Sequence, residues 1–221
     1  MINIIITWTT GMVWEWVLLT CLDSSHIWKI LIINRSRYNL EHPKLTQIIH
    51  KNMYDLSEIE DQLVGYDACY YCIWTTSLRK TDKEYKKITH DLTLYIAQLL
   101  YKNNQNMIFC YVSGKWTDRS GNSFSSWINI KGKTETDLVD IYTKNAYMYR
   151  PWYMKPYPWA QNTQSIYIYL GRAGRFFKTF VPSAYNTLEE VGKSMISVTL
   201  DGYKKDALEC VDIKKTARKV A

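Results

Sequence analysis

Short apolar runs alternate with helical patterns along most of the chain, and this alternation restricts the possible folds more than any other feature. Strands are predicted at residues 3–7, 29–34, 46–50, 68–73, 107–112 and 146–149. Helices are predicted between them at 12–22, 56–63, 83–101 and 126–141, the second of these opened by Ser57 as N-cap with Glu60 three residues later. Strands separated by helices form parallel sheets that are covered on both faces.

The pattern therefore predicts an α/β fold with a doubly wound, Rossmann-like parallel sheet of strand order 3-2-1-4-5-6. Ligands of such sheets bind at the carboxyl ends of the strands. We expect residues 1–150 to form this core. Residues 151–221 would add a small, mainly helical segment to the same globular domain, with helices at 163–170 and 188–200 after a loop that contains Pro151, Pro156 and Pro158.

Charge and cysteine content narrow the function classes. The 221 residues carry a net charge of +7, with lysines spread along the chain and densest at Lys204-Lys205 and Lys214-Lys215. This favours a solvated basic surface over nucleic-acid binding. Cys69 and Cys72 form a C-x-x-C motif, but residues three apart on a strand point to opposite faces. We therefore expect buried free thiols, as in a reducing cytoplasm, instead of a metal or redox pair.

Neither a metal site nor a membrane segment is predicted. The four histidines, at positions 26, 42, 50 and 90, are scattered without a ligand spacing, and His90 with Asp91 is expected on a surface or dimer-facing helix. Residues 2–22 are apolar, but they lack a basic start and contain Asn3 and Glu15, so they are interpreted as strand plus helix, and not as a leader or membrane span.

The first junction between strand and helix carries the most specific motif. Trp8, Gly11 and Trp14 are spaced by three residues within TWTTGMVWEW. With glycine at positions 8 and 14, the segment would be the T-G-x-x-G-x-x-G loop, whose glycines permit a tight turn, close approach of backbone N–H groups to a pyrophosphate, and close packing of helix on strand.

With these residues, the chain resembles a bacterial atypical short-chain dehydrogenase of the NAD-dependent epimerase/dehydratase superfamily. The matching stretches run through nearly the whole sequence: TTGMV at 9–13, IINR at 32–35, YDLSEIEDQLVGYDACYYC at 54–72, YVSG at 111–114, KGKTE at 131–135, YRP at 149–151 and NTLEEVG at 186–192. The resemblance implies the same Rossmann-like fold that the periodicity predicts.

Tryptophan stands at several positions where such proteins carry glycine: 8, 14, 16, 74, 116, 152 and 159. The chain has only nine glycines among its 221 residues. This is about 4%, whereas average proteins contain roughly 7% glycine. Glycine at the seven positions would raise the content to about 7%. Our hypothesis is that UGA codons, read as glycine in the native host, have been translated as tryptophan. If the tryptophans are genuine, three indoles around one loop would obstruct a pyrophosphate.

The resemblance also implies a nicotinamide dinucleotide cofactor. Arg35 at the end of the second strand favours NADP(H), since arginine attracts a 2′-phosphate that a carboxylate would repel, while NAD stays open. The implied cofactor-binding residues are Thr7, Trp8, Thr10, Gly11, Met12, Val13, Asn34, Arg35, Asp55, Leu56, Ile73, Trp74, Thr75 and Lys131.

Catalysis in this superfamily uses a serine or threonine with a Y-x-x-x-K pair. Ser113 matches the serine and Lys131 the lysine, but Trp127 occupies the tyrosine position, and indole offers one N–H donor and no usable acid. Tyr111 and Tyr153 are weak substitutes. Glu135 and Asp137 follow Lys131 and are expected to be solvated.

Three functions stay open. The first is an NADP(H)-dependent oxidoreductase or epimerase-like enzyme acting on an unknown small carbonyl or sugar substrate. The second is a non-catalytic NADP(H)-binding regulator or scaffold, which a missing catalytic tyrosine would permit. The third is a nucleic-acid-binding protein, supported only by the net charge. The sequence does not fix the oligomeric state.

Overall fold

The computed structural model describes residues 1–7, 12–73, 75–155 and 185–220. Its centre is a sheet of seven strands in the order β3-β2-β1-β4-β5-β6-β9, with every adjacent pair parallel. The strands are β1 (Ile2–Thr7), β2 (Ile27–Asn34), β3 (Leu45–Ile49), β4 (Ala68–Tyr71), β5 (Ile108–Val112), β6 (Ala146–Arg150) and β9 (Ala207–Glu209). The predicted doubly wound sheet and its strand order are confirmed.

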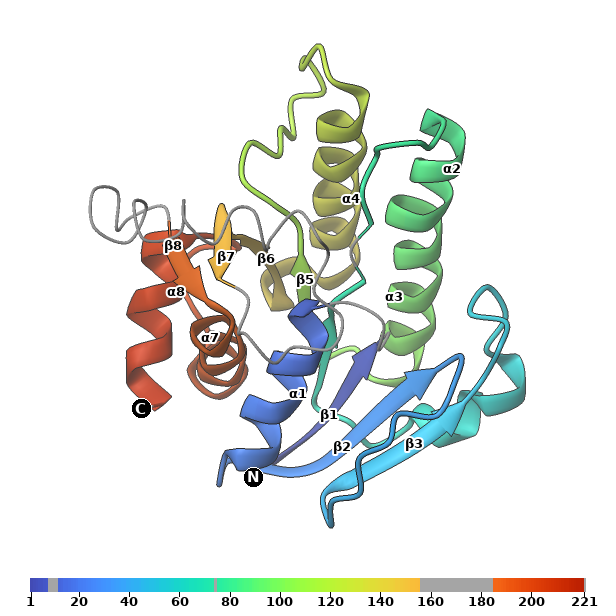
Figure 1. The fold of residues 1–221 in the computed structure, drawn as a ribbon, viewed down its shortest axis with the longest axis vertical. Helices are drawn as coiled ribbons and strands as arrows, with labels where there is room; N and C mark the ends of the chain where they lie inside the picture. The colour runs from blue at the N-terminus through green and yellow to red at the C-terminus, as the bar shows by residue number, and fades with distance from the viewer. Residues whose placement is uncertain (8–11, 74, 156–184, 221) are drawn as a thin grey trace.

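Helices cover both faces of this sheet, as Figure 1 shows. One face carries α1 (Met12–Asp23), α7 (Leu188–Asp201) and α8 (Cys210–Ala217). The other face carries the 3-10 turn η1 (Ser57–Leu63), α2 (Asp82–Lys86), α3 (Leu92–Asn103) and α4 (Ser126–Tyr142). Two short 3-10 turns, η3 (Thr143–Asn145) and η5 (Arg218–Val220), follow α4 and α8.

Alternate residues of each strand fill two separate cores, because successive strand side chains point to opposite faces. Ile4 and Ile6 face α1 and α7, whereas Ile5 between them belongs to the core under α3 and α4. Cys72 and Cys69 divide in the same way. All five cysteines are buried and unpaired, and burial raises the pKa of both motif thiols. The expectation of buried free thiols is confirmed.

Two local expectations are wrong. The segment 56–63 is a 3-10 turn, and Ser57 does not cap it: the Ser57 hydroxyl instead donates to Asp55 Oδ1 at 2.7 Å. The long helix expected at 83–101 is interrupted by a π-helical turn, η2 (Lys87–Asp91), between α2 and α3. Thr81 and Glu84 form a reciprocal capping box that starts α2.

The C-terminal segment contributes more strand than expected. Strands β7 (Tyr153–Lys155) and β8 (Tyr185–Thr187) form a separate parallel pair. Beyond the expected helix α7, β9 joins the edge of the main sheet beside β6, and α8 follows at once. The helix predicted at 163–170 lies outside the described residues. No helix in the described ranges is both long and apolar enough to cross a lipid bilayer.

Candidate functional site

The carboxyl ends of the parallel strands meet at one edge of the sheet, and most of the predicted site residues that the structure describes lie there. Thr7 ends β1, Asn34 ends β2, Ile73 follows β4 and Ser113 follows β5. Helix α1 also begins at this edge (Figure 1). Trp8, Thr10, Gly11 and Trp74 lie outside the described residues.

Ser113 and Lys131 meet although eighteen positions separate them. Lys131 Nζ donates to the Ser113 carbonyl oxygen at 2.6 Å, and the Ser113 hydroxyl lies 2.8 Å from that of Thr117. Both residues are buried. Burial lowers the pKa of Lys131 to about 8, although the Glu135 carboxylate opposes this shift. The ammonium and the hydroxyl are thus held by protein atoms beside a cleft.

A glycine allows the loop after β5 to approach α4 this closely. A Cβ on Gly132 would lie 1.7 Å from the carbonyl oxygen of Asp118. Because no other residue lacks a Cβ, the motif K-G-K-T-E requires glycine immediately after Lys131. The contact fixes the loop that contains Ser113 and Thr117 against the helix that contains Lys131.

A buried ion network fastens the same loop from the other side. Glu135 is fully buried and accepts hydrogen bonds from Arg119 Nε at 2.8 Å and Arg150 Nε at 2.9 Å. Arg119 also donates to Asp206 at 2.6 Å, just before β9. The expectation of a solvated Glu135 is therefore wrong, because arginines from two distant segments neutralise it. The sequence gives no direct signal of these partners.

The cleft beside Ser113 and Lys131 has a volume of about 270 Å³. Its described lining comes from the segment after β4, from α2, from the loop after β5, from α4 and from the end of β6. The lining residues are Thr75, Thr76, Ser77, Tyr85, Ser113, Gly114, Lys115, Trp116, Trp127, Lys131, Pro151 and Trp152. Of these, Thr75, Ser113, Trp127 and Lys131 were predicted site residues, and Tyr85 was missed.

Some buried polar side-chain atoms at the ends of β1 and β2 have no hydrogen-bond partner within the described ranges. The Thr7 hydroxyl and both amide atoms of Asn34 are buried and have no hydrogen-bond partner within the described ranges. Unpaired buried polar groups are rare and costly. At the carboxyl ends of β1 and β2 they fit the polar groups of a ligand that crosses this edge.

Of the residues expected around the adenosine, some are exposed to solvent and others are buried in the core. Arg35 is exposed directly after β2. The Asp55 carboxylate is also exposed, and hydrogen bonds from Ser57 hold its pKa below the ordinary value. Leu56 is fully buried in the core, with its backbone N–H donated to Tyr95 Oη at 2.7 Å. Val13 and Ile73 are buried as well.

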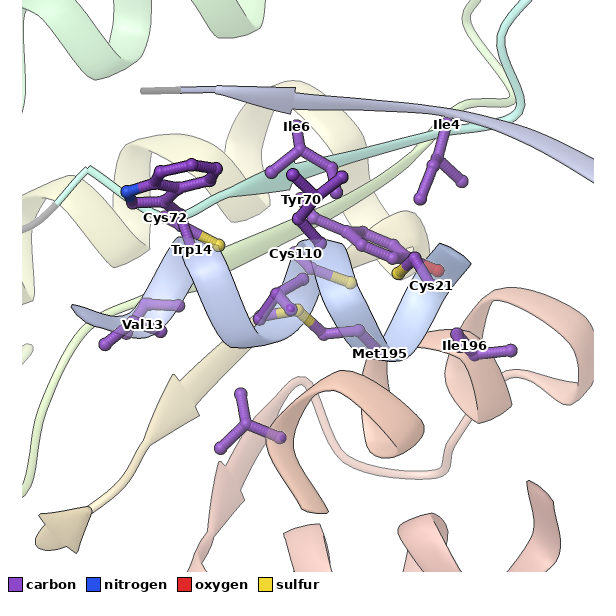
Figure 2. Close-up of a cluster of buried hydrophobic side chains, with 14 of the residues drawn as sticks. Ile4, Ile6, Val13, Trp14, Cys21, Tyr70, Cys72, Cys110, Met195 and Ile196 are labelled. Atoms are coloured by element: carbon purple, nitrogen blue, oxygen red, sulfur yellow. The ribbon is translucent and has the colours of Figure 1, made fainter. Parts of the chain in front are cut away.

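The suspected glycine positions in the described ranges fall into two classes. Trp14 is fully buried in the core between α1 and the sheet (Figure 2), in edge-to-face contact with Tyr38, and Trp16 is buried near it. Trp116 and Trp152 are instead 60% and 40% exposed and contact each other edge to face at the cleft. Trp8, Trp74 and Trp159 lie outside the described residues.

The backbone of Trp116 bears on the glycine hypothesis. Its φ is +68°, in the left-handed region that glycine adopts freely and bulky residues rarely adopt. Gly65, Gly121 and Gly202 have the same sign of φ, as do the non-glycine residues Arg79 and Thr143. A position that needs φ > 0, and whose indole is mostly exposed, fits glycine better than tryptophan.

Histidine placement corrects one expectation and leaves metal binding without support. His90 is buried, with Nδ1 2.7 Å from Asp91 and Nε2 2.7 Å from Asp137. It therefore links the π-helical turn to α4 and is not a surface residue. Within the described ranges, no group of three or more His, Cys, Asp or Glu residues could hold a metal ion.

Comparisons with known proteins establish the fold. No family model and no curated protein matches this sequence. Among solved structures, dTDP-glucose 4,6-dehydratase from Streptomyces venezuelae, crystallised with NAD, is similar over 98% of this chain and 80% of its own, with 9% identity and a TM-score of 0.67. UDP-N-acetylglucosamine 4-epimerase from Methanobrevibacter ruminantium is similar over 93% and 74%, with 14% identity and a TM-score of 0.62.

A third similar structure is ADP-L-glycero-D-manno-heptose-6-epimerase from Helicobacter pylori. The similarity extends over 99% of this chain and 82% of the epimerase chain, with 11% identity and a TM-score of 0.65. At such identities the likeness concerns the fold. The Rossmann-like architecture expected from the sequence is the architecture of these epimerases and dehydratases.

Proposed function

We propose that this chain is a short-chain dehydrogenase-like protein that binds a nicotinamide dinucleotide, with a preference for NADP(H), and acts as an oxidoreductase or epimerase on a small substrate. The observation that carries the proposal is the buried pair of Ser113 and Lys131 beside a cleft, on the sheet edge where Thr7 and Asn34 hold unpaired polar atoms. Similar structures with the same fold contain NAD.

The residues at this edge fit the two halves of such a cofactor. Thr7 and Asn34 would bind its polar adenosine and phosphate groups, while Lys131 would hold the nicotinamide ribose next to the cleft. Arg35, exposed directly after β2, would supply the positive charge that a 2′-phosphate needs, because a guanidinium binds phosphate in a bidentate manner. When bound, the nicotinamide would supply or accept a hydride.

The cleft favours a small substrate. Its volume of about 270 Å³ is just below the range of about 300–1,000 Å³ that is ordinary for ligand pockets. Ser113 would polarise a carbonyl, with its hydroxyl oriented by Thr117. Trp127, which is not among the suspected glycine positions, gives the described part of the lining an aromatic side chain, which suits an apolar or planar substrate body.

A second function is favoured by one observation. Trp127 lines the cleft at the position where a catalytic tyrosine is expected, and it can donate only one N–H. A protein that binds NADP(H) without turnover, as a regulator or scaffold, would have this arrangement.

Fluorescence titration with NADPH and NADH tests the cofactor assignment. We expect saturable binding with a lower Kd for NADPH; the absence of binding to either would contradict the proposal. Hydride transfer to a panel of small carbonyl compounds then separates the enzyme from the binding protein. Salt-sensitive retention on DNA, without nucleotide binding, would favour the nucleic-acid-binding function instead.

A further inference from the structure

We propose that Tyr85 is the proton donor of the cleft, in place of the tyrosine that Trp127 replaces. This inference rests on the proposed function. Tyr85 lies in α2, far in sequence from Ser113 and Lys131, yet its side chain lines the same cleft. Among the described lining residues it is the only phenol, the group that the missing tyrosine would have supplied.

Contacts at both ends of α2 hold Tyr85 in position. The capping box of Thr81 and Glu84 fixes the first turn, with Thr81 N donating to Glu84 Oε2 at 2.8 Å. Ser126, the first residue of α4, donates to Asp82 Oδ1 at 2.6 Å. This bond fastens the start of α2 to the start of α4, which contains Trp127 and Lys131.

The π-helical turn holds the other end of α2. It follows Tyr85 after one residue and is tied to α4 through His90 and Asp137 at 2.7 Å. The Tyr85 hydroxyl interacts with the side chain of Thr89 within this turn. Single π-helical turns inside α-helices occur frequently at functional sites, where they change the direction of the side chains around them.

Two other described tyrosines near the strand ends, Tyr71 and Tyr111, do not line the described part of the cleft. Tyr111, directly before Val112 and Ser113, is buried in the core under α3 and α4 and packs against Tyr71 with ring centroids 6.0 Å apart. Neither ring is among the described lining residues. Tyr85 is only 2% exposed, and burial raises its pKa to about 12, so the phenol stays protonated at neutral pH.

The proposed step balances as follows. A bound reduced nicotinamide would supply the hydride to the carbonyl carbon, and the C=O π electrons would move to oxygen. That oxygen takes the proton of Tyr85 Oη as the phenolic O–H bond breaks. The tyrosinate is reprotonated by water, and the products are the alcohol and the oxidised cofactor. The Lys131 ammonium would stabilise the transient negative charge on oxygen.

The test compares Tyr85→Phe with Tyr111→Phe, which removes a buried phenol outside the described lining. Thermal unfolding first checks that both variants fold. We expect Tyr85→Phe to reduce 4-nitrobenzaldehyde with NADPH at least 100-fold more slowly than wild type, with the Kd for NADPH within twofold. Tyr111→Phe should retain at least one third of the wild-type rate.

A second readout does not depend on turnover. In protein labelled with ¹³Cζ-tyrosine, the Tyr85 resonance is identified as the one missing from Tyr85→Phe. We expect 4-nitrobenzaldehyde to shift this resonance and to leave that of Tyr111 in place.

Two results would overturn the assignment of Tyr85. One is an undiminished rate in Tyr85→Phe, and the other is a Tyr85 resonance that does not move at saturating aldehyde. Neither result would affect the proposed cofactor binding. Failure of wild-type protein to bind NADPH contradicts the proposed function itself, so the two failures are distinguishable.

Discussion

Replacing Trp116 by glycine and, separately, by alanine tests whether this position is built for glycine. Both variants remove the indole and its contact with Trp152, so that loss cancels in the comparison. What differs is the backbone. With φ at +68°, alanine keeps a left-handed strain of about 1–2 kcal/mol that glycine relieves. Glycine in turn costs about 0.5–1 kcal/mol, because its unfolded chain is more flexible.

At the midpoints of these two ranges, the balance predicts that Trp116→Gly is more stable than Trp116→Ala by about 0.75 kcal/mol. Position 152 is the matched control, since Trp152 is not among the described residues with positive φ. There the order should reverse, with glycine less stable than alanine by about 0.5–1 kcal/mol. Urea unfolding followed by circular dichroism measures all four free energies.

A Trp116→Ala protein as stable as Trp116→Gly would refute the conformational argument. The codon hypothesis has its own direct measurement, which is peptide mass spectrometry of the protein from its native host. Tryptophan detected at positions 8, 14 and 74 would end that hypothesis.

Three further predictions concern the site. Gly132→Ala should lower the free energy of unfolding in urea by about 2–4 kcal/mol, because the new Cβ would collide with the Asp118 carbonyl. Gly114→Ala is the control. Its Cβ would make an ordinary 3.8 Å contact with Lys131 Nζ, so the cost should be under about 1 kcal/mol. The Lys131 pKa is about 8 in the folded protein and 10.5 for an ordinary lysine, so the unfolded chain binds more protons between these pH values and the free energy of unfolding should rise with pH. From pH 8 to 10 this gain is about 2–3 kcal/mol, and an equal gain in Lys131→Met would contradict it. Arg35→Glu should weaken NADPH binding about 10–100-fold while NADH binding changes little in the same fluorescence titration; equal losses for both would argue against a role for Arg35 at the 2′-phosphate.

The sheet could be predicted because its signals are local. Runs such as residues 29–34 are long, apolar and rich in isoleucine, and helical periodicity separates them. Strand β9 was missed because a strand of three residues is too short to show an alternating apolar pattern. Its identity as a strand depends on pairing with β6. The π-helical turn was missed for a related reason, since its residues have ordinary helical periodicity.

The site was predictable in part for the same reason. Ser113 and Lys131 were found because their segments resemble the superfamily's motifs, and the structure brings the two residues together. Glu135 and Tyr85 were not recognised, because their environments depend on distant segments. Glu135 looks like a solvated helix residue until Arg119 and Arg150 are placed beside it. Tyr85 is one of 18 tyrosines, and only the fold distinguishes it.

The pairing of Met148 with Ala207 has a consequence for synthesis of the chain on the ribosome. While the intervening segment is still being translated, the outer edge of β6 has no neighbour, and an open edge of this kind can pair with another nascent chain. A gene truncated before codon 207 would make that exposure permanent. Such a product should accumulate in inclusion bodies, even though it retains every strand that contributes to the cleft.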